Sequence, residues 1–259
     1  SERKIHSEYT YFGIFSPSFA GLIRRDNKNP TLLKHKYIPN IKSIPVKEYN
    51  KKHDFVYFGR VEDVKGVDKI IEAIGIIKSK GRNVTLNIIG KGNKKYLKYL
   101  YLKVAQLGLE NNVFFTGHLS TFSDVYKRVK EAKISVFSSR FENFGGALLE
   151  SIIMEQPVTA TAVGGIPYLN KDEETILLSK YGDIKCLAKN MLTLLDDMDY
   201  AKSLVLKSKS FVLKEFDSKK LIDRLVKQYD AIIKNFYHNI PIPEELLFNP
   251  NEFTIKKKD

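Results

Sequence analysis

Cysteine is nearly absent from this sequence, and long apolar runs are absent altogether. Cys186 is the single cysteine among 259 residues, so no disulfide can form within the chain. No stretch reaches the roughly 18 consecutive apolar residues that a membrane-spanning helix needs. The first residues, Ser-Glu-Arg-Lys-Ile-His, lack the apolar core of a signal peptide. We therefore expect a cytoplasmic protein.

Acidic residues are in deficit, with 30 Asp and Glu against 43 Lys and Arg and a formal net charge of +13. A positive field attracts polyanions such as nucleic acid, anionic lipid or phosphorylated substrates. The basic residues are scattered, however, and we find no nucleic-acid-binding module, no zinc-ligand spacing and no basic stripe interleaved with aromatic residues. We expect a phosphorylated substrate and no nucleic-acid partner, with peripheral contact to an anionic membrane as a second expectation. The alternative is an ordinary solvated, lysine-rich surface.

Apolar runs of strand length alternate with longer amphipathic runs from residue 54 onward. In the first long run Val67, Ile70 and Ile74 recur at helical spacing. Strict alternation of strands and helices predicts a parallel sheet with helices on both faces, which is a doubly wound, Rossmann-like α/β domain. The expected strands are 54–59, 84–89, 113–116, 134–137 and 158–162, and the expected helices are 65–80, about 96–108, 124–129 and 147–156.

Residues 1–50 do not follow this alternation. Within them, 11–15 is typical of a strand, 18–25 of a short helix and 36–38 of another strand, before a polar linker over 47–54. The segment has too few elements for a core of its own, so we interpret it as the end of a neighbouring domain. Its apolar residues, Phe12, Ile14, Phe15 and Leu22, are expected to pack on the final helix.

The chain after Tyr181 is expected to be helical. Its last helix carries an apolar stripe at helical spacing, formed by Leu221, Leu225, Tyr229, Ile232 and Phe236.

The loop after the first expected strand carries two cations. Ligands of doubly wound domains bind in loops at the carboxyl ends of the strands, and this loop places Arg60 and Lys65 beside a helix N-terminus, which favours anions. The guanidinium offers a planar fork and the ammonium a compact charge. Together they could neutralise a diphosphate, including its developing charge as a leaving group. The alternative is a solvated Arg and Lys in an exposed turn.

A second loop joins two carboxylates to a glycine-rich helix start. Glu142 precedes the backbone amides of Phe144, Gly145 and Gly146, and Glu150 lies further along the helix that follows. A carboxylate accepts hydrogen bonds from paired hydroxyl groups, so each Glu suits a sugar or ribose diol. Two acids at this spacing could occur by chance, but Glu150 lies in an apolar helical stretch where a charge needs a partner.

Other glycines follow the neighbouring strands. Gly90, Gly92 and Gly117 permit close backbone approach and could form walls around a base. His118 could join them, although an exposed loop histidine is the simpler interpretation. The Gly164-Gly165 turn either closes the far side or only links two elements.

These motifs occur in one order along the chain. Together they resemble the C-terminal half of a family 4, GT-B-type, retaining glycosyltransferase, over about Phe55 to Ile233. Tyr37 to Asn40 resembles the end of the first domain of such enzymes. The motifs that carry the resemblance are Gly59-Arg60, Lys65-Gly66, Gly90-Lys91-Gly92, Gly117, Glu142 with Glu150, Pro157-Val158 and Val163-Gly164-Gly165-Ile166-Pro167.

The resemblance implies roles for these residues. Arg60 and Lys65 would hold the donor diphosphate, Glu150 the ribose hydroxyls and Glu142 the hydroxyls of the transferred sugar, with backbone amides at 144–146 as further contacts. Arg60, Lys65 and Glu142 would be the catalytic residues. The family uses no metal or other cofactor, because its cations replace a divalent ion. Gly90, Gly92 and Gly117 complete the expected donor-binding set.

The expected substrates are a UDP- or GDP-sugar donor and a sugar or lipid-linked acceptor, in cell-envelope polysaccharide or glycoconjugate synthesis. We expect a first-domain remnant at 1–50, a nucleotide-sugar-binding domain at 51–216 and a crossover helix and tail at 217–259. The chain alone should transfer sugar weakly or not at all. A nucleotide-sugar epimerase and a non-catalytic binding module are the alternatives.

Overall fold

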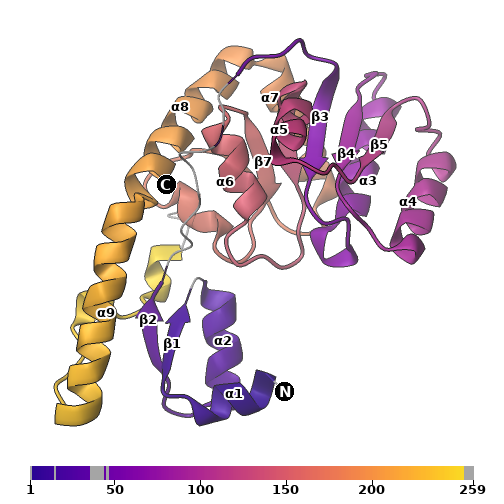
Figure 1. The fold of residues 1–259 in the computed structure, drawn as a ribbon. Helices are drawn as coiled ribbons and strands as arrows, with labels where there is room; N and C mark the ends of the chain where they lie inside the picture. Colours follow the sequence, from indigo (N-terminus) through magenta and orange to yellow (C-terminus); the bar gives the residue numbers. More distant parts are fainter. Residues whose placement is uncertain (1, 15, 36–43, 45–46, 254–259) are drawn as a thin grey trace.

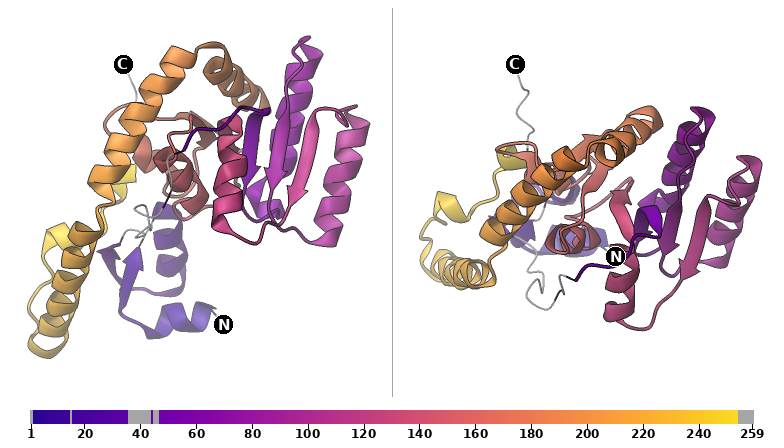
Figure 2. Two further views of the ribbon diagram at one scale, coloured as in Figure 1. Left: turned by 45° about the horizontal axis from the view of Figure 1, so that its top comes forward. Right: turned by 90° about the horizontal axis from the view of Figure 1, so that it is seen from above.

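The computed structural model describes residues 2–14, 16–35, 44 and 47–253, and its main body is a six-stranded parallel sheet in the order β5-β4-β3-β6-β7-β8 (Figure 1). Helix α3 packs against α4 and α7, while α5 contacts β3 and β6 and α6 contacts β6 and β7. Helices thus cover both faces (Figure 2), which confirms the predicted doubly wound α/β fold. The strands are β3 (His53–Phe58), β4 (Leu86–Ile89), β5 (Val113–Gly117), β6 (Ala132–Phe137), β7 (Val158–Thr161) and β8 (Leu177–Ser179).

Local sequence signals explain where the helices begin. Asn93 and Thr121 cap the starts of α4 and α5, each accepting a hydrogen bond from a backbone amide three residues on, and Asp183 does the same for α7. The strands of the sheet centre are buried on both faces and therefore read as nearly continuous apolar runs. The helices of the main body are α3 (Val67–Ser79), α4 (Lys94–Gln106), α5 (Phe122–Lys130), α6 (Gly146–Ile153), α7 (Ile184–Asp196) and α8 (Met198–Glu215).

The strand order places the candidate loops at one point. From β3 the chain winds outward through β4 to β5, then returns to the other side of β3 with β6 and winds outward again. The order therefore reverses between β3 and β6, and ligands of open α/β sheets bind outside the carboxyl ends of the strands at such a switch point. The Arg60–Lys65 loop follows β3, and the Glu142 loop follows β6.

Two strands were not anticipated. β8 has only three residues, too few for a periodic signal, and it forms because Thr161 and its neighbours offer an edge with which it pairs in parallel. Near the N-terminus, the second strand is β2 (Thr31–Lys34), earlier than the predicted strand at 36–38. The 36–38 prediction and the Tyr37–Asn40 resemblance lie outside the described residues.

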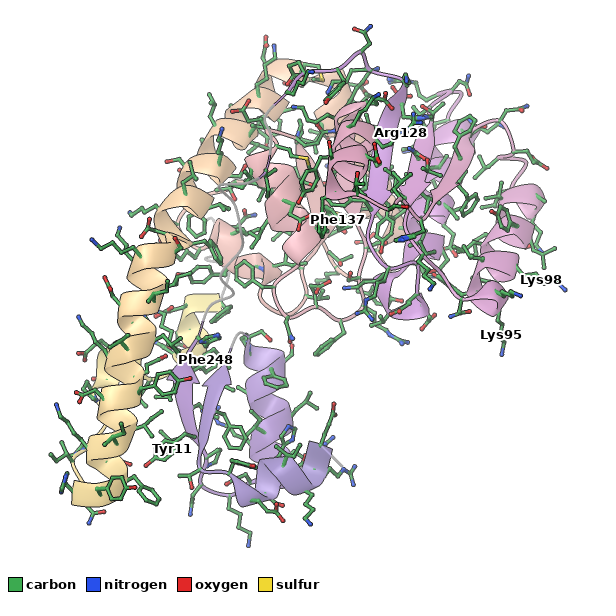
Figure 3. All side chains as sticks on the ribbon, in the orientation of Figure 1. Tyr11, Lys95, Lys98, Arg128, Phe137 and Phe248 are labelled. Carbon is green, nitrogen blue, oxygen red and sulfur yellow. The ribbon has the colours of Figure 1, made fainter. Side chains whose placement is uncertain are left out.

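The N-terminal segment forms a second unit beside the main body (Figure 1). It consists of α1 (Glu2–Glu8), β1 (Tyr11–Ile14), α2 (Pro17–Asp26) and β2, and β1 pairs with β2 in parallel. Contrary to our expectation it has a small core of its own, which Phe248 from the C-terminal tail joins. Its buried members are Ile14, Ala20, Ile23, Leu32 and Phe248. Figure 3 labels Phe248 and Tyr11 on the side of this unit that faces the last helix.

The last helix, α9 (Ser218–His238), extends past the main body along this unit (Figure 1). The Tyr11 hydroxyl donates to Asn235 Oδ1 at 2.7 Å, and Gln228 Nε2 donates to the Lys34 carbonyl at 2.7 Å. The predicted apolar stripe is only partly buried, because Leu221 lies in the main core while Tyr229 and Phe236 are 59% and 68% exposed. Polar contacts attach α9 to the unit.

Short 3-10 turns complete the chain at Asp63–Lys65, Ile166–Asn170, Glu244–Leu246 and Pro250–Phe253. Among the helices that the structure describes, none is both long enough and apolar enough to cross a bilayer.

Candidate functional site

Two adjoining hollows lie at the carboxyl ends of the central strands. The larger, about 470 Å³, is walled by the β3 and β4 loops, by the chain from His118 to Val125 and by α6. The smaller, about 140 Å³, is walled by the β3 loop, the β6 loop and the start of α6. Both are lined by Phe58, Gly59, Arg60 and Ala147, so they are two halves of one crevice.

Close backbone contacts hold the loops of the crevice together. A Cβ atom on Gly90 would lie 1.7 Å from the Gly59 carbonyl oxygen, and one on Gly164 would lie 1.5 Å from the Glu142 carbonyl oxygen. Both glycines also have positive φ, a conformation that disfavours other residues. The Gly164 turn therefore supports the Glu142 loop from behind, which favours the first of the two interpretations that the sequence left open.

Lys65 and Glu142 meet in the smaller hollow. The Lys65 ammonium lies 2.5 Å from Glu142 Oε2, and the two side chains are only 18% and 17% exposed. The Ser139 hydroxyl donates to the same carboxylate oxygen at 3.3 Å. Sequence reasoning placed both residues at the donor, but it did not anticipate that each would be the other's partner.

Arg60 is far more open than Lys65. Its side chain is 70% exposed, and its Nη1 lies 3.1 Å from Glu62 Oε2. Its position on both hollows nevertheless places it at the junction of the crevice. The hydroxyl of buried Tyr57 donates to the Arg60 carbonyl at 2.6 Å and so fixes the backbone of this loop.

Glu150 lines the larger hollow from α6. It has no hydrogen-bond or ion-pair partner among the residues described, and burial raises the pKa of its carboxyl above the ordinary value. A sheltered carboxylate without a partner is the feature that the sequence predicted for a ligand-binding acid.

The structure brings most predicted residues together, with three exceptions. Arg60, Lys65, Gly90, Glu142, Gly145, Gly146 and Glu150 all line the crevice. Gly92, Gly117 and Phe144 do not. Gly117 instead accepts a hydrogen bond from the Gly90 amide at 2.8 Å, and the buried Phe144 ring contacts Phe216 edge-on at 4.8 Å between centroids. For Phe144, only main-chain contact with a ligand stays a prediction.

Sequence reasoning missed some of the lining. Ser139 was overlooked, although Ser138-Ser139 directly follows the β6 strand and the rule for carboxyl ends would have found it. The segment 119–122 was missed as well, because nothing in its composition marks it. His118 is exposed, as its default interpretation held, and yet it contributes to the wall.

Size alone does not identify the site. Within the described chain, hollows of about 740 Å³ along α9 and about 620 Å³ beside Lys130 are larger. We assign the candidate site to the carboxyl edge because the topology and the converging loops coincide there. The described residues contain no group of three or more His, Cys, Asp or Glu side chains arranged to hold a metal ion.

Comparison with known proteins agrees with this architecture. A family profile described as "Glycosyl transferases group 1" matches residues 40–211. Among curated relatives, the capsular polysaccharide biosynthesis glycosyltransferase CapM of Staphylococcus aureus is 28% identical over 182 residues, which is 69% of this chain and 46% of CapM. The chain thus spans about half the length of such relatives.

Two solved structures share the fold. A variant of S. aureus TarM in complex with Fondaparinux, alpha-GlcNAc-glycerol and UDP has a TM-score of 0.76 at 18% identity, covering 89% of this chain and 46% of that one. Anabaena HepE in complex with UDP has a TM-score of 0.71 at 18% identity, covering 88% of this chain and 66% of that one.

Proposed function

Because this chain belongs to the group 1 glycosyl transferase family, we propose that its crevice binds a nucleotide-diphosphate sugar and serves in transferring that sugar to an acceptor. The observation that carries the proposal is the joining of two unlike half-sites. The larger hollow holds the unpartnered carboxylate of Glu150, and the smaller one holds the ammonium of Lys65 and the carboxylate of Glu142.

The two halves match the parts of such a donor. A nucleoside in the larger hollow would donate its ribose hydroxyls to Glu150, since a carboxylate accepts from a diol. The diphosphate would lie at the junction beside Arg60 and Lys65, and the sugar would reach Glu142. The start of α6 at Gly145 and Gly146 lines the smaller hollow and would offer amides to the same anion.

We further propose membership of family 4, a retaining mechanism and no metal, with Arg60 and Lys65 offsetting the charge of the leaving diphosphate. Two fold neighbours were solved with UDP, which makes UDP the first nucleotide to test and GDP the second. CapM is named for capsular polysaccharide synthesis. This name supports the proposal that the protein transfers a hexosyl group to a sugar or lipid-linked acceptor in cell-envelope polysaccharide or glycoconjugate synthesis.

The proposal is tested by ligand binding, because turnover needs an acceptor that is yet to be identified. Calorimetry and thermal unfolding with UDP, GDP and their sugars should show a stabilised protein for one base, since a ligand that binds only the folded state raises its stability. Lys65→Ala and Glu150→Gln should each weaken that binding. Binding of none of these ligands, or unchanged binding in both variants, would refute the assignment.

Two further assays, on the fate of the donor sugar, separate the alternative classes. An epimerase would return the donor with an altered sugar, which chromatography of the incubated donor detects. A non-catalytic module would bind the donor and neither change it nor transfer its sugar when a longer chain and an acceptor are supplied.

A further inference from the structure

The crevice contains an anion of the chain's own beside its most sheltered cation. The Glu142 carboxylate lies 2.5 Å from the Lys65 ammonium, inside the hollow of about 140 Å³. Tyr57 lines the same hollow, and burial, followed by the charge of Glu142, raises the pKa of its phenol. In this structure the carboxylate thus occupies the place at Lys65 that a phosphate oxygen would take.

The loop that carries Glu142 is fixed at its backbone. Gly164 leaves no room behind the Glu142 carbonyl, and the Gly165 amide donates to the Asn143 carbonyl at 2.7 Å. The carboxylate is therefore free to move only by rotation of its own side chain. Its other contact, the Ser139 hydroxyl at 3.3 Å, is a weak one.

A diphosphate cannot simply join this pair. Lys65 and Glu142 neutralise each other, and a second anion in so small a space would face the carboxylate at close range, where like charges repel strongly in a sheltered environment. The Arg60–Glu62 pair at the crevice mouth is different, because the Arg60 side chain is 70% exposed and water weakens its interactions.

We infer that Glu142 is an internal counter-ion which the donor's diphosphate displaces from Lys65, and that the displaced carboxylate then accepts hydrogen bonds from hydroxyls of the donor sugar. The inference rests on the proposed function and adds a specificity to it. A nucleotide diphosphate without sugar displaces Glu142 and leaves it unpaired, whereas a sugar nucleotide provides it with new partners. The crevice therefore selects the sugar-bearing donor and releases the spent nucleotide.

The test compares Glu142→Gln with the parent chain and with Glu62→Gln, which removes the exposed partner of Arg60. Calorimetry measures UDP and UDP-glucose, or the GDP pair if guanosine is the preferred base. Glu142→Gln should bind the bare nucleotide diphosphate more tightly than the parent does, on the order of tenfold, because Lys65 is freed. Its affinity for the sugar nucleotide should not exceed that of the parent. Glu62→Gln should leave the ratio of the two affinities within about twofold, as expected for an exposed pair.

A second variant guards against a merely structural effect. Glu142→Asp keeps the charge and should not tighten binding of the bare diphosphate, and circular dichroism checks that both variants are folded. Unchanged or weaker UDP binding by a folded Glu142→Gln, while the parent binds UDP, would overturn the inference. A parent chain that binds no nucleotide would instead refute the proposed function, so the two failures are distinct.

Discussion

The main body and the N-terminal unit contain the same supersecondary structure, but their cores differ greatly. In each, two parallel strands are connected through a helix: β3–α3–β4 in the main body and β1–α2–β2 in the unit. In α3 the residues Val67, Ile70, Ile71, Ala73, Ile74 and Ile77 are buried, whereas in α2 only Ala20 and Ile23 are.

The difference is one of context. The β3–α3–β4 unit is part of a six-stranded sheet covered on both faces, and its apolar residues belong to one large core. The β1–β2 pair has two strands, which is marginal alone, and it recruits the far end of the chain: the Phe248 amide donates to the Leu32 carbonyl at 2.9 Å. Phe253 packs against both cores and links them.

This contrast explains where a binding site can form. The candidate crevice combines tightly packed glycine loops, a sheltered ion pair and a partly buried carboxylate, all of which are costly features. A large core can offset these costs, and a core as small as that of the N-terminal unit cannot.

The largest expected effect tests the two cores directly. Ile71→Ala in α3 should lower the free energy of unfolding of the main body by about 2–5 kcal/mol, because it removes fully buried apolar volume. Ile23→Ala in α2 should leave that transition nearly unchanged while speeding amide exchange in residues 11–34. The chain has no tryptophan, so chemical unfolding is followed by circular dichroism, which measures the stability of the main body. Hydrogen exchange measures the opening of residues 11–34. Equal loss of main-body stability in the two variants would show that the cores unfold together.

Binding should depend on the main body alone. Lys65→Ala should weaken nucleotide-diphosphate binding by about 2–5 kcal/mol if the contact is desolvated, and Arg60→Ala by less, because its side chain is 70% exposed. Uridine or guanosine without phosphate should bind parent and variants alike, and Ile23→Ala should bind as the parent does. A larger loss for Arg60→Ala than for Lys65→Ala in calorimetry would contradict this ranking.

Glu150 provides a pH dependence that the N-terminal unit should not affect. Glu150→Gln should cost about 1.5–3 kcal/mol in nucleotide binding, as for a hydrogen bond to a charged group. Because burial raises the pKa of Glu150 in the folded state, its contribution to stability is present below the ordinary value of 4.5 and is lost as the pH rises through the raised pKa. Ribose hydroxyls favour the ionised form, so nucleotide affinity should increase over the same range.

Titrating binding and unfolding against pH checks this behaviour, and Glu150→Gln should lack both trends. Identical pH profiles for the variant and the parent would remove Glu150 from the ribose site.

The smallest effect concerns the surface charge of both regions. With a net charge of +13, the protein should sediment with acidic vesicles at low salt. Each basic residue near the membrane surface contributes about 1 kcal/mol of binding free energy. Rising salt should release it, because screening weakens such attraction. Equal, salt-independent sedimentation with neutral vesicles would point to a different cause.

The fold of the main body and the loops of the crevice followed from the sequence. Alternating periodicities are local, and so are the glycines and charged residues at strand ends, so five of the six strands of the main sheet could be predicted, and so could the placement of Arg60, Lys65, Glu142 and Glu150 at its carboxyl edge. The division at residues 50 and 216 and the donor roles themselves stay predictions.

Only the tertiary structure decided which groups meet. Lys65 and Glu142 are 77 positions apart, and no periodicity reports that they pair, because their distance depends on the β3–β6 register and on Gly164 behind the loop. Likewise, β8 forms because it pairs with the edge of β7. Strand β2 is stabilised by contacts that include Phe248, near the other end of the chain. The exposure of α9 at Tyr229 and Phe236 depends on what lies beside the helix. Sequence periodicity specifies an apolar face, whereas packing against distant segments determines whether that face is buried.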